Sequence, residues 1–430
     1  MSCDQFGVDW KGRRVLVVGL GKSGMSASTF LSGLGCRVRV TEMRDEDATQ
    51  RDARQLREQG IDAVELGAHR PQRWGEQDVV VVSPGVPESS VPIRWSLDHG
   101  VPILSEIELA FRFCPSPIIA VTGTNGKSSV VTLIQQILMA ARRPAVACGN
   151  LGIPFTQVLP GVTRETTVVL EVSSFQLMWC DQFHPAIGVL LNLGSNHLDR
   201  HHDRAGYLAA KARLFARQTP QDAAVLNARS PEVVAMARLL QSRCVWFGDS
   251  SWPLFPEAWE AALAVARLLD IPDPLTNQMM REFRGLEHRL EHLGMVQGVY
   301  VINDSKSTTP DSLLYALTRC RGGVVPILGG RNKGMDFSVL KGALHEARIH
   351  GVVLIGESRQ HLRALFNGTP PICECGSLDE AVQAAMALAH PGDTVLFSPA
   401  CASFDMFRNF EERGRIFKQL VVEKKGTQTN

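Results

Sequence analysis

The chain has 430 residues, of which 44% are hydrophobic, which suits about three globular domains and excludes an intrinsically disordered chain. Its 45 lysines and arginines nearly balance its 44 aspartates and glutamates, so no overall basic field favours nucleic acid as a partner. No apolar run approaches the length of a membrane span, so we expect no membrane association either.

The ten cysteines are scattered along the chain, and only Cys373 and Cys375 lie close together. This spacing argues against zinc ribbons and disulfide frameworks. It favours reduced thiols, as in a cytoplasmic protein.

Short apolar runs alternate with longer amphipathic stretches, which is typical of βα units and parallel sheets. We therefore predict an α/β protein with domain boundaries near Glu106 and Gly285, giving domains 1–106, 107–285 and 286–430. The predicted strands, in chain order, are Arg14–Val18, Cys36–Thr41, Asp78–Ser83, Pro117–Thr122, Thr167–Glu171, Ile187–Asn192, Val299–Asp304, Val324–Leu328, Val352–Ile355 and Thr394–Ser398.

The first strand runs into a glycine-rich turn with the pattern G-x-G-x-x-G, formed by Gly19, Gly21 and Gly24. Glycines at such a turn allow backbone N–H groups to approach a pyrophosphate, and an acidic residue such as Glu42 at the end of the next strand often meets a ribose. A nucleotide ligand is the favoured interpretation. A nicotinamide dehydrogenase and a glycine turn that binds nothing are the alternatives.

A second loop, V-T-G-T-N-G-K-S-S from Val121 to Ser129, lies between a predicted strand and a predicted helix. Lys127 can reach the β- and γ-phosphates of a nucleotide, and Ser128 can place a hydroxyl on Mg²⁺. The loop departs from a strict Walker A motif, because Val121 stands where the first glycine would fall. The alternative is a glycine turn with a solvated lysine.

Three residues downstream have chemistry that suits the same site, although each also has an ordinary explanation. Glu171 ends a predicted strand and can hold Mg²⁺, or it can be a solvated strand-end carboxylate. His197 lies in the loop after the next strand, where a lone histidine is more often a capped loop residue. Lys211 is flanked by alanines on a predicted helix and, taken alone, would be an ordinary surface lysine.

Together these residues resemble one family, the Mur ligases of peptidoglycan synthesis. The motifs in order are T-G-T-N-G-K-S, E-V-S-S-F-Q-L, N-L-G-S-N-H-L-D-R-H, Y-L-A-A-K, G-L-E-H-R, N-D-S-K-S-T, L-G-G-R-N-K-G-M-D-F and S-P-A-C-A-S-F-D-M-F-R-N-F-E-E-R-G. The last four resemble the branch that adds D-glutamate to UDP-N-acetylmuramoyl-L-alanine. The resemblance implies a Rossmann-like N-terminal domain, a P-loop-type central ATPase domain and a Rossmann-like C-terminal domain.

The resemblance also implies a role for individual residues. The UDP substrate would contact Gly19, Gly21, Lys22, Ser23, Gly24, Glu42, Arg44, Gly85 and Asn150. ATP would contact Gly123, Thr124, Asn125, Gly126, Lys127, Ser128, Ser129 and Asp304. The metal ligands would be Ser128, Glu171, His197 and a carbamylated Lys211. The catalytic residues would be Lys127, His197, Lys211, Arg289 and Lys306. Glutamate would contact Thr308, Lys333, Ser403 and Phe410. Cys401, in the last motif, is expected to be a buried structural thiol.

The implied reaction uses ATP and Mg²⁺ and passes through an acyl phosphate, which the amine of glutamate then attacks. We expect a monomer that binds only these small molecules. Two alternatives stay open, namely a Mur-type ligase that adds another amino acid such as L-glutamate, and a nucleotide-binding paralogue without turnover.

The sequence departs from the family pattern in two places. The family motif G-x-H-N-x-x-N, whose asparagines face adenine, is absent from the stretch Pro253–Leu269, and we expect the central domain to be shortened after residue 248. Adenine recognition is therefore unassigned. In addition, Glu42 and Met43 stand where the family usually has aspartate and threonine, so contacts there must differ in detail.

Overall fold

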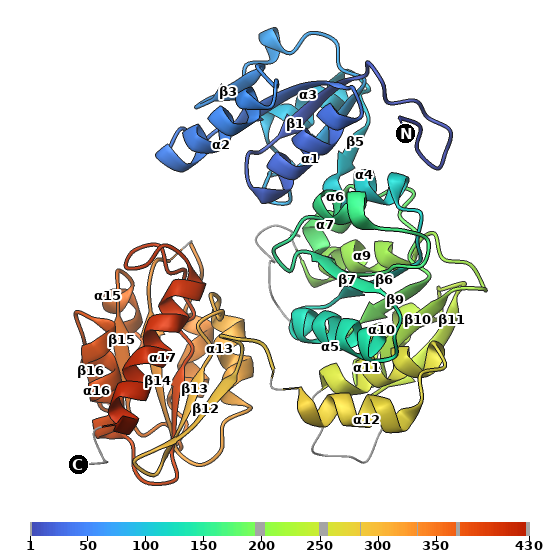
Figure 1. Ribbon diagram of the computed structural model, residues 1–430. Coiled ribbons are helices and arrows are strands. Elements are labelled where there is room, and N and C mark those ends of the chain that lie inside the picture. The colour runs from blue at the N-terminus through green and yellow to red at the C-terminus, as the bar shows by residue number, and fades with distance from the viewer. Residues whose placement is uncertain are drawn as a thin grey trace. The chain divides into compact units, whose positions relative to one another are not determined.

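The computed structural model describes residues 2–193, 203–248, 257–283, 285–332, 334–366 and 370–426. The chain forms two compact units, residues 1–283 and 284–430 (Figure 1). The first unit contains a five-stranded and a six-stranded sheet, and the second contains one six-stranded sheet. Within the described residues, no helix is both long and apolar enough to cross a membrane, and the ten cysteines are free thiols.

The first sheet is parallel, with strand order β3-β2-β1-β4-β5. Its elements are β1 (Arg14–Val18), α1 (Lys22–Gly33), β2 (Arg37–Glu42), α2 (Asp47–Glu58), β3 (Val64–Leu66), β4 (Val79–Val82), α3 (Val91–Asp98), β5 (Ile103–Ser105) and α4 (Glu106–Phe113). Alternate residues of β1 enter different cores: Val15 and Val17 pack under α1, α2 and α4, while Leu16 and Val18 pack with Trp74 on the other face. A strand buried on both faces needs a continuous apolar run, which explains its sequence.

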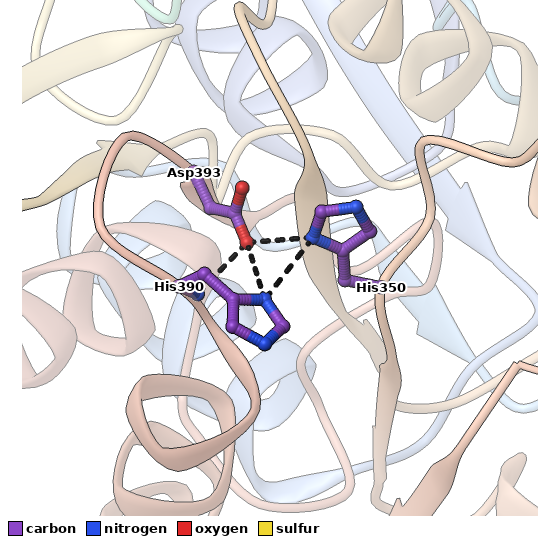
Figure 2. Close-up of side chains that lie close together, drawn as sticks. All are labelled: His350, His390 and Asp393. Carbon is purple, nitrogen blue, oxygen red and sulfur yellow. Dashed lines mark hydrogen bonds and ion pairs between the residues drawn. The ribbon is translucent and has the colours of Figure 1, made fainter.

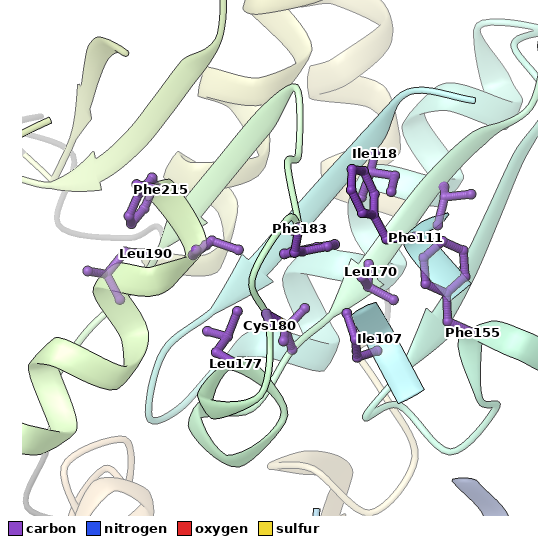
Figure 3. Close-up of a cluster of buried hydrophobic side chains, with 14 of the residues drawn as sticks. Ile107, Phe111, Ile118, Phe155, Leu170, Leu177, Cys180, Phe183, Leu190 and Phe215 are labelled. Carbon is purple, nitrogen blue, oxygen red and sulfur yellow. The ribbon is translucent and has the colours of Figure 1, made fainter. Parts of the chain in front are cut away.

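The second sheet is also parallel, with order β11-β10-β9-β6-β8-β7. Its strands are β6 (Ile118–Thr122), β7 (Ala145–Gly149), β8 (Thr167–Glu171), β9 (Ile187–Leu190), β10 (Ala223–Asn227) and β11 (Arg243–Phe247). Its helices are α5 (Lys127–Ala140), α6 (Phe155–Val158), α7 (Ser174–Met178), α9 (Arg204–Ala212), α10 (Pro231–Ala237), α11 (Glu257–Leu268) and α12 (Asp273–Glu282). Ile119 and Val121 face α5, α11 and α12, whereas Ile118 and Leu170 face the opposite core drawn in Figure 3.

Helix α4 joins these two sheets, because it contributes side chains to the cores of both. Its buried Glu108 accepts hydrogen bonds from the backbone N–H groups of Asp181, Gln182 and Phe183 at 2.9–3.2 Å. Its buried Glu106 accepts from the backbone N–H and hydroxyl of Thr156 at 2.6 and 2.7 Å. The first two predicted domains therefore meet in a packed, hydrogen-bonded helix and form one unit.

The sheet of the second unit has order β12-β13-β17-β14-β15-β16. Its strands are β12 (Glu291–Val296), β13 (Val299–Asn303), β14 (Val324–Gly329), β15 (Val352–Ile355), β16 (Ile372–Glu374) and β17 (Thr394–Phe397). Its helices are α13 (Pro310–Leu317), α14 (Lys341–Leu344), α15 (Arg359–Arg363), α16 (Leu378–Leu388) and α17 (Phe410–Gly426). The strands are parallel except β12, which pairs antiparallel with β13, contrary to a wholly parallel expectation. Phe417 of α17 stacks on Phe397 with ring centroids 4.4 Å apart.

Candidate active site

The loop between β6 and α5 has two positions, Gly123 and Gly126, where a larger residue would be strained. Gly126 has φ +84°, and a Cβ on Gly123 would lie 2.9 Å from Leu191 Cβ. Asn192, just after β9, holds the loop from the side, because its Oδ1 accepts from the backbone N–H groups of Thr124 and Asn125 at 3.1 and 2.9 Å. The loop is thus preformed at the amino end of α5, where a helix dipole favours anions.

Lys127 lies folded across this loop. Its ammonium group donates to the carbonyl oxygens of Gly123 and Thr124, both at 2.9 Å. The charge therefore sits directly over the loop rather than in bulk solvent, which contradicts the solvated-lysine alternative.

Next to the loop, Ser128 and Asn150 hold the two oxygens of one buried carboxylate. The hydroxyl of Ser128 donates to Glu171 Oε2, and Asn150 Nδ2 donates to Glu171 Oε1 at 2.8 Å. Glu171 is 1% exposed, so its interpretation as a solvated strand-end residue is wrong. A hydroxyl and a carboxylate in contact are oxygen ligands of the type that Mg²⁺ prefers.

Lys211 is also buried, at 1% exposure, and its interpretation as a surface lysine is wrong. Its Nζ donates to Gly123 O at 3.0 Å and to Thr122 Oγ1 at 3.4 Å, and lies 4.5 Å from the ring centroid of Tyr207. Burial and, to a smaller extent, the charge of Lys127 lower the pKa of Lys211 well below its ordinary 10.5. This pocket therefore favours a neutral amine over an ammonium ion.

The glycine turn of the first sheet is shaped by close packing. A Cβ on Gly24 would lie 1.9 Å from Gly19 O, whereas one on Gly21 would meet nothing within 4 Å. Beside the turn, Glu42 accepts from Leu20 N at 2.8 Å and from Arg44 N and Nη2 at 2.9 Å. Burial alone would raise the pKa of Glu42, but these hydrogen bonds lower it to about 2.

The glycine turn and the buried carboxylate are connected through the loop that follows β7. Asn150 lies at the start of this loop, and Lys22 Nζ donates to the carbonyl of Gly152, further along it, at 3.4 Å. In addition, the hydroxyls of Ser26 in α1 and Thr156 are 2.6 Å apart. Residues predicted separately for UDP and for metal therefore belong to one continuous structure in the first unit.

In the second unit, Asp304 follows β13 and is 7% exposed. Its carboxylate accepts from Leu290 N at 3.1 Å and from Ser398 Oγ at 2.9 Å. Burial raises the pKa of Asp304 to about 7, although these hydrogen bonds and the charge of Arg289 oppose the shift. Lys306 lies close by in sequence, and its Nζ is 5.0 Å from the ring centroid of Phe410.

Similarity to known proteins covers nearly the whole chain. Three family profiles match: "Mur ligase MurD-like, N-terminal domain" over residues 13–105, "Mur ligase middle domain" over 121–257, and "Mur ligase, glutamate ligase domain" over 288–401. UDP-N-acetylmuramoylalanine--D-glutamate ligase of Acidobacterium capsulatum is 37% identical, with 97% of this chain and 98% of that protein covered. The chain belongs to the Mur ligase family.

A second relative and two solved structures extend this result. UDP-N-acetylmuramoylalanine--D-glutamate ligase of Pelotomaculum thermopropionicum is also 37% identical, covering 97% of this chain and 99% of its own. MurF ligase of Thermotoga maritima in complex with ADP has a TM-score of 0.61 at 16% identity and covers 97% of this chain and 96% of its own. UDP-N-acetylmuramate-alanine ligase MurC of the same organism has a TM-score of 0.56 at 18% identity, with 97% and 100% covered. These structures confirm the three-domain Mur ligase fold.

For several residues predicted for this Mur ligase, the structure gives the position in the fold, while their roles stay predictions. In the first unit, Ser23 lies at the start of α1, Gly85 in the turn after β4, and Ser129 in the first turn of α5. In the second, Thr308 precedes α13 and Ser403 is 2% exposed. Cys401 is buried as expected, and burial raises the pKa of its thiol to about 11. His197 and Lys333 lie outside the described residues, as do residues 249–256 of the stretch where we expect the central domain to be shortened.

Three residues that organise the site lie within the family motifs but were given no role from the sequence. Asn192 holds the phosphate loop, and the hydroxyl of Tyr207 is 3.2 Å from Thr124 Oγ1. Arg413 is 1% exposed and donates to Ser305 O at 2.7 Å and to Cys401 O at 3.1 Å. For Asn192, its place after the strand beside the phosphate loop was an available signal. For Arg413, the pattern gave no sign of burial.

Proposed function

We propose that this chain is an ATP-dependent ligase that adds D-glutamate to UDP-N-acetylmuramoyl-L-alanine through an acyl phosphate, in peptidoglycan precursor synthesis. The proposal rests mainly on the contacts of the loop after β7. This loop contacts the carboxylate of Glu171 through Asn150 and the glycine turn of the first domain through Gly152 and Lys22. A substrate whose UDP end binds at that turn can therefore extend along this loop toward the phosphate loop. The names of the full-length relatives support the same reaction.

In the first step, an oxygen of the acceptor carboxylate attacks the γ-phosphorus of ATP, and the bond to the β,γ-bridging oxygen breaks to release ADP. Lys127 has its ammonium over the phosphate loop, where its positive charge would offset negative charge on the transferring group. Asn192 keeps the loop N–H groups in position for the phosphates. In the second step, the glutamate amine attacks the acyl carbon, loses a proton and displaces phosphate.

The residues around Glu171 fit magnesium, because a buried carboxylate and the Ser128 hydroxyl supply oxygen ligands beside the loop. When bound, magnesium would neutralise charge on the transferring phosphoryl group. We infer that His197 is a further ligand, and that Lys211 is carbamylated. The buried amine of Lys211 suits this modification, because burial favours the neutral form that attacks CO₂. The product is an anion, which cations stabilise.

The second unit contains the remaining residues that we expect to bind ligands. We infer that Arg289, Asp304 and Lys306 reach the nucleotide, and that Thr308, Lys333, Ser403 and Phe410 hold glutamate. Arg413 acts as a positioning residue, because its guanidinium ties the Cys401 loop to Ser305, whose hydroxyl in turn donates to Phe410 O at 2.9 Å. Removing it would release both glutamate-binding segments together.

The experiment is phosphate release by the purified chain with ATP, Mg²⁺ and UDP-N-acetylmuramoyl-L-alanine, to which D-glutamate, L-glutamate or no amino acid is added. We expect phosphate release only with D-glutamate. Hydroxylamine, added in place of glutamate, should trap the acyl phosphate as a hydroxamate. Phosphate release with L-glutamate but not with D-glutamate would show that the chain adds L-glutamate instead. Binding of ATP with neither release nor hydroxamate would make the chain a paralogue without turnover.

A further inference from the structure

Three potential metal ligands converge in the second unit at a place that the ligase reaction does not use. His350 lies just before β15, while His390 and Asp393 lie in the turn between α16 and β17 (Figure 2). Strands β17, β14 and β15 are parallel neighbours, so their amino ends meet at one edge of the sheet. Asp304 and Ser398 follow the carboxyl ends of β13 and β17, at the opposite edge. The cluster and Asp304 are therefore separated by the length of the strands.

The distances within this cluster suit one small cation. His350 Nδ1 is 2.8 Å from Asp393 Oδ2, and His390 Nδ1 is 3.4 Å from both Asp393 Oδ2 and His350 Nδ1. Around a tetrahedral zinc ion with bonds of about 2.0–2.1 Å, two ligand atoms are about 3.3 Å apart. Two of the three separations match that edge, and the third has the length of a hydrogen bond. The two imidazole rings stand nearly perpendicular, at 79°, with their Nδ1 atoms directed at the same carboxylate oxygen.

The surrounding backbone fixes the buried part of this cluster. Only 7% of the Asp393 side chain is exposed, and its Oδ2 also accepts from the backbone N–H of His390 at 2.8 Å. Gly323 lies against both groups, because a Cβ there would be 2.4 Å from Asp393 Oδ1 and 2.3 Å from His350 Cε1. The His390 side chain is 73% exposed, so an ion can enter from solvent. The buried carboxylate and the two more accessible imidazoles would supply three ligands, which leaves the fourth position of a tetrahedral ion to water.

A second aspartate–histidine pair in the chain shows what a purely structural arrangement looks like. His184 Nε2 is 2.7 Å from Asp222 Oδ2, and Asp222 also caps a turn through Thr219 N at 2.7 Å. Among the described residues, the group that can surround one ion is His350, His390 and Asp393, so the His184 pair has no third ligand there. The difference between the two arrangements is the added imidazole of His390. A turn cap does not require that ring, whereas a metal site does.

We propose that His350, His390 and Asp393 bind a divalent transition-metal ion, with zinc as the best match to two imidazoles and one carboxylate. The ion ties the turn before β15 to the turn before β17. It stabilises the second unit without taking part in the ligase reaction. Binding requires both Nδ1 atoms as lone-pair donors, so each neutral imidazole carries its proton on Nε2 in the metal-bound form.

The test is calorimetric titration of the full-length chain with Zn²⁺ in the presence of excess Mg²⁺, which occupies oxygen-ligand sites. The variants are His390→Ala, His390→Gln and His350→Ala, with His184→Ala as the matched control. We expect one site in the wild type and in His184→Ala, and an affinity at least about tenfold weaker in the other three. Zn²⁺ should raise the melting temperature of the wild type but not of His390→Ala. Ligase activity of His390→Ala should match the wild type.

Cobalt distinguishes this site from the cysteines, which also bind soft metals. Co²⁺ bound to imidazole and carboxylate gives weak visible bands, whereas thiolate ligands add intense near-ultraviolet charge-transfer bands. We expect only the weak bands, and their loss in His390→Ala. Equal Zn²⁺ affinity in the wild type and the His350 and His390 variants would overturn the proposal. So would a thiolate-dominated cobalt spectrum, or an equal loss of affinity in His184→Ala.

Discussion

Asn150 Nδ2 lies 2.8 Å from Glu171 Oε1 and donates a hydrogen bond to it, although Asn150 follows β7 and Glu171 is the last residue of β8. Ser128 donates to the other oxygen, so this carboxylate is fixed in orientation from both sides. The same loop reaches Lys22 of the first domain through Gly152. Asn150 therefore couples the geometry of Glu171, the proposed metal ligand, to the place where the UDP substrate is expected.

Asn150→Leu should weaken metal use, because it removes the donor that orients Glu171 while keeping a similar side-chain volume. Loss of such an orienting partner typically costs about 10- to 100-fold in metal affinity. We expect the Mg²⁺ concentration for half-maximal phosphate release to rise at least about tenfold, with a higher KM for the UDP substrate. The matched control is Gln135→Leu in α5, which removes an amide that donates to Ala145 O at 3.3 Å and should leave the Mg²⁺ requirement unchanged. An unchanged Mg²⁺ requirement in Asn150→Leu would remove this role.

Lys127→Ala should abolish turnover and leave the fold intact. The ammonium donates to backbone carbonyls of the loop, and water can replace it there once the side chain is shortened. Loss of one group that stabilises transition-state charge costs about 10²–10³ in rate, and we expect at least that decrease in kcat. The measurement is phosphate release, with circular dichroism and melting temperature as checks on folding. Lys341→Ala, at an exposed position of α14, is the matched control and should keep full activity. Ligation at the wild-type rate by a folded Lys127→Ala protein would rule out the assigned role.

Substitutions at two glycines of the first turn can distinguish a packing role from a ligand-binding role. Gly24→Ala places a Cβ 1.9 Å from Gly19 O, so we expect a loss of about 1–3 kcal/mol in the free energy of unfolding. Gly21→Ala meets nothing within 4 Å and has φ −94°, so it should fold normally. If the turn approaches a pyrophosphate, Gly21→Ala should still weaken binding of the UDP substrate in calorimetry. Normal binding by Gly21→Ala would favour a turn that only packs the helix on the strand.

The sequence predicted those strands best that are marked by a continuous run of apolar residues. The predicted strands Arg14–Val18, Thr167–Glu171 and Val352–Ile355 have the observed bounds, because strands buried on both faces are continuous apolar runs with sharp ends. Short or edge strands such as β3 and β16 were missed, since they carry few apolar residues and depend on their neighbours. The antiparallel β12 was missed because most of its residues are partly or fully exposed, so no continuous apolar run marks the strand.

The candidate site was predictable where spacing along the chain carries the chemistry. The strand–loop–helix pattern around Lys127 and Ser128 predicted a loop of the observed form. Burial was not predictable: taken alone, Glu171 could equally be a solvated strand-end residue and Lys211 an ordinary surface lysine, and only the packing of β8 and α9 shows that both are buried. Arg413 lies in the last family motif, but its burial and its contact with Ser305 could not be predicted, because Ser305 comes from a distant segment of the chain.

Asp304 should make the stability of the second unit depend on pH. Its pKa is raised from 3.8 to about 7, mainly by burial, so the folded state favours the neutral acid. The resulting stability is fully present below the unfolded pKa and is lost as pH rises through about 7. Between about pH 5.5 and about pH 8 the loss should be about 2 kcal/mol. Asp304→Asn should remove this part of the pH dependence.

The measurement for Asp304 must report on the second unit. The tryptophans all precede residue 284, so tryptophan fluorescence follows the first unit instead. Pulse proteolysis in urea, at several pH values and with the wild type and Asp304→Asn compared, cleaves the second unit when it unfolds, which removes the full-length band from a gel. The difference between the two proteins cancels the other titrating groups. Parallel pH profiles for the two proteins would show that Asp304 ionises normally.

Lys211 is the residue for which a functional role and an ordinary structural role predict the most different results. The amine is buried, contacts Gly123 O and lies over the Tyr207 ring, and its pKa is lowered by burial and by the charge of Lys127. A neutral amine attacks CO₂, and the carbamate that forms is an anion beside Lys127 and the expected metal. We predict that Lys211→Ala is nearly inactive and that short carboxylic acids such as acetate or formate partly restore its activity by occupying the vacated anion site. Lys211→Arg should not be restored, because its guanidinium keeps a positive charge in the pocket.

Two measurements distinguish this role from a structural one. Addition of ¹³C-labelled bicarbonate should give a carbamate signal in the ¹³C spectrum of the wild type that is absent from Lys211→Ala, and removal of CO₂ should lower wild-type activity reversibly. A structural lysine would give neither result, and its loss would not be corrected by an added anion. Because the side chain is buried, Lys211→Met serves as a volume-matched variant that keeps the pocket filled. It should fold at least as well as Lys211→Ala, remain inactive, and resist acetate, since the methionine blocks the anion site. Full activity of Lys211→Met would show that neither charge nor carbamate is needed at this position.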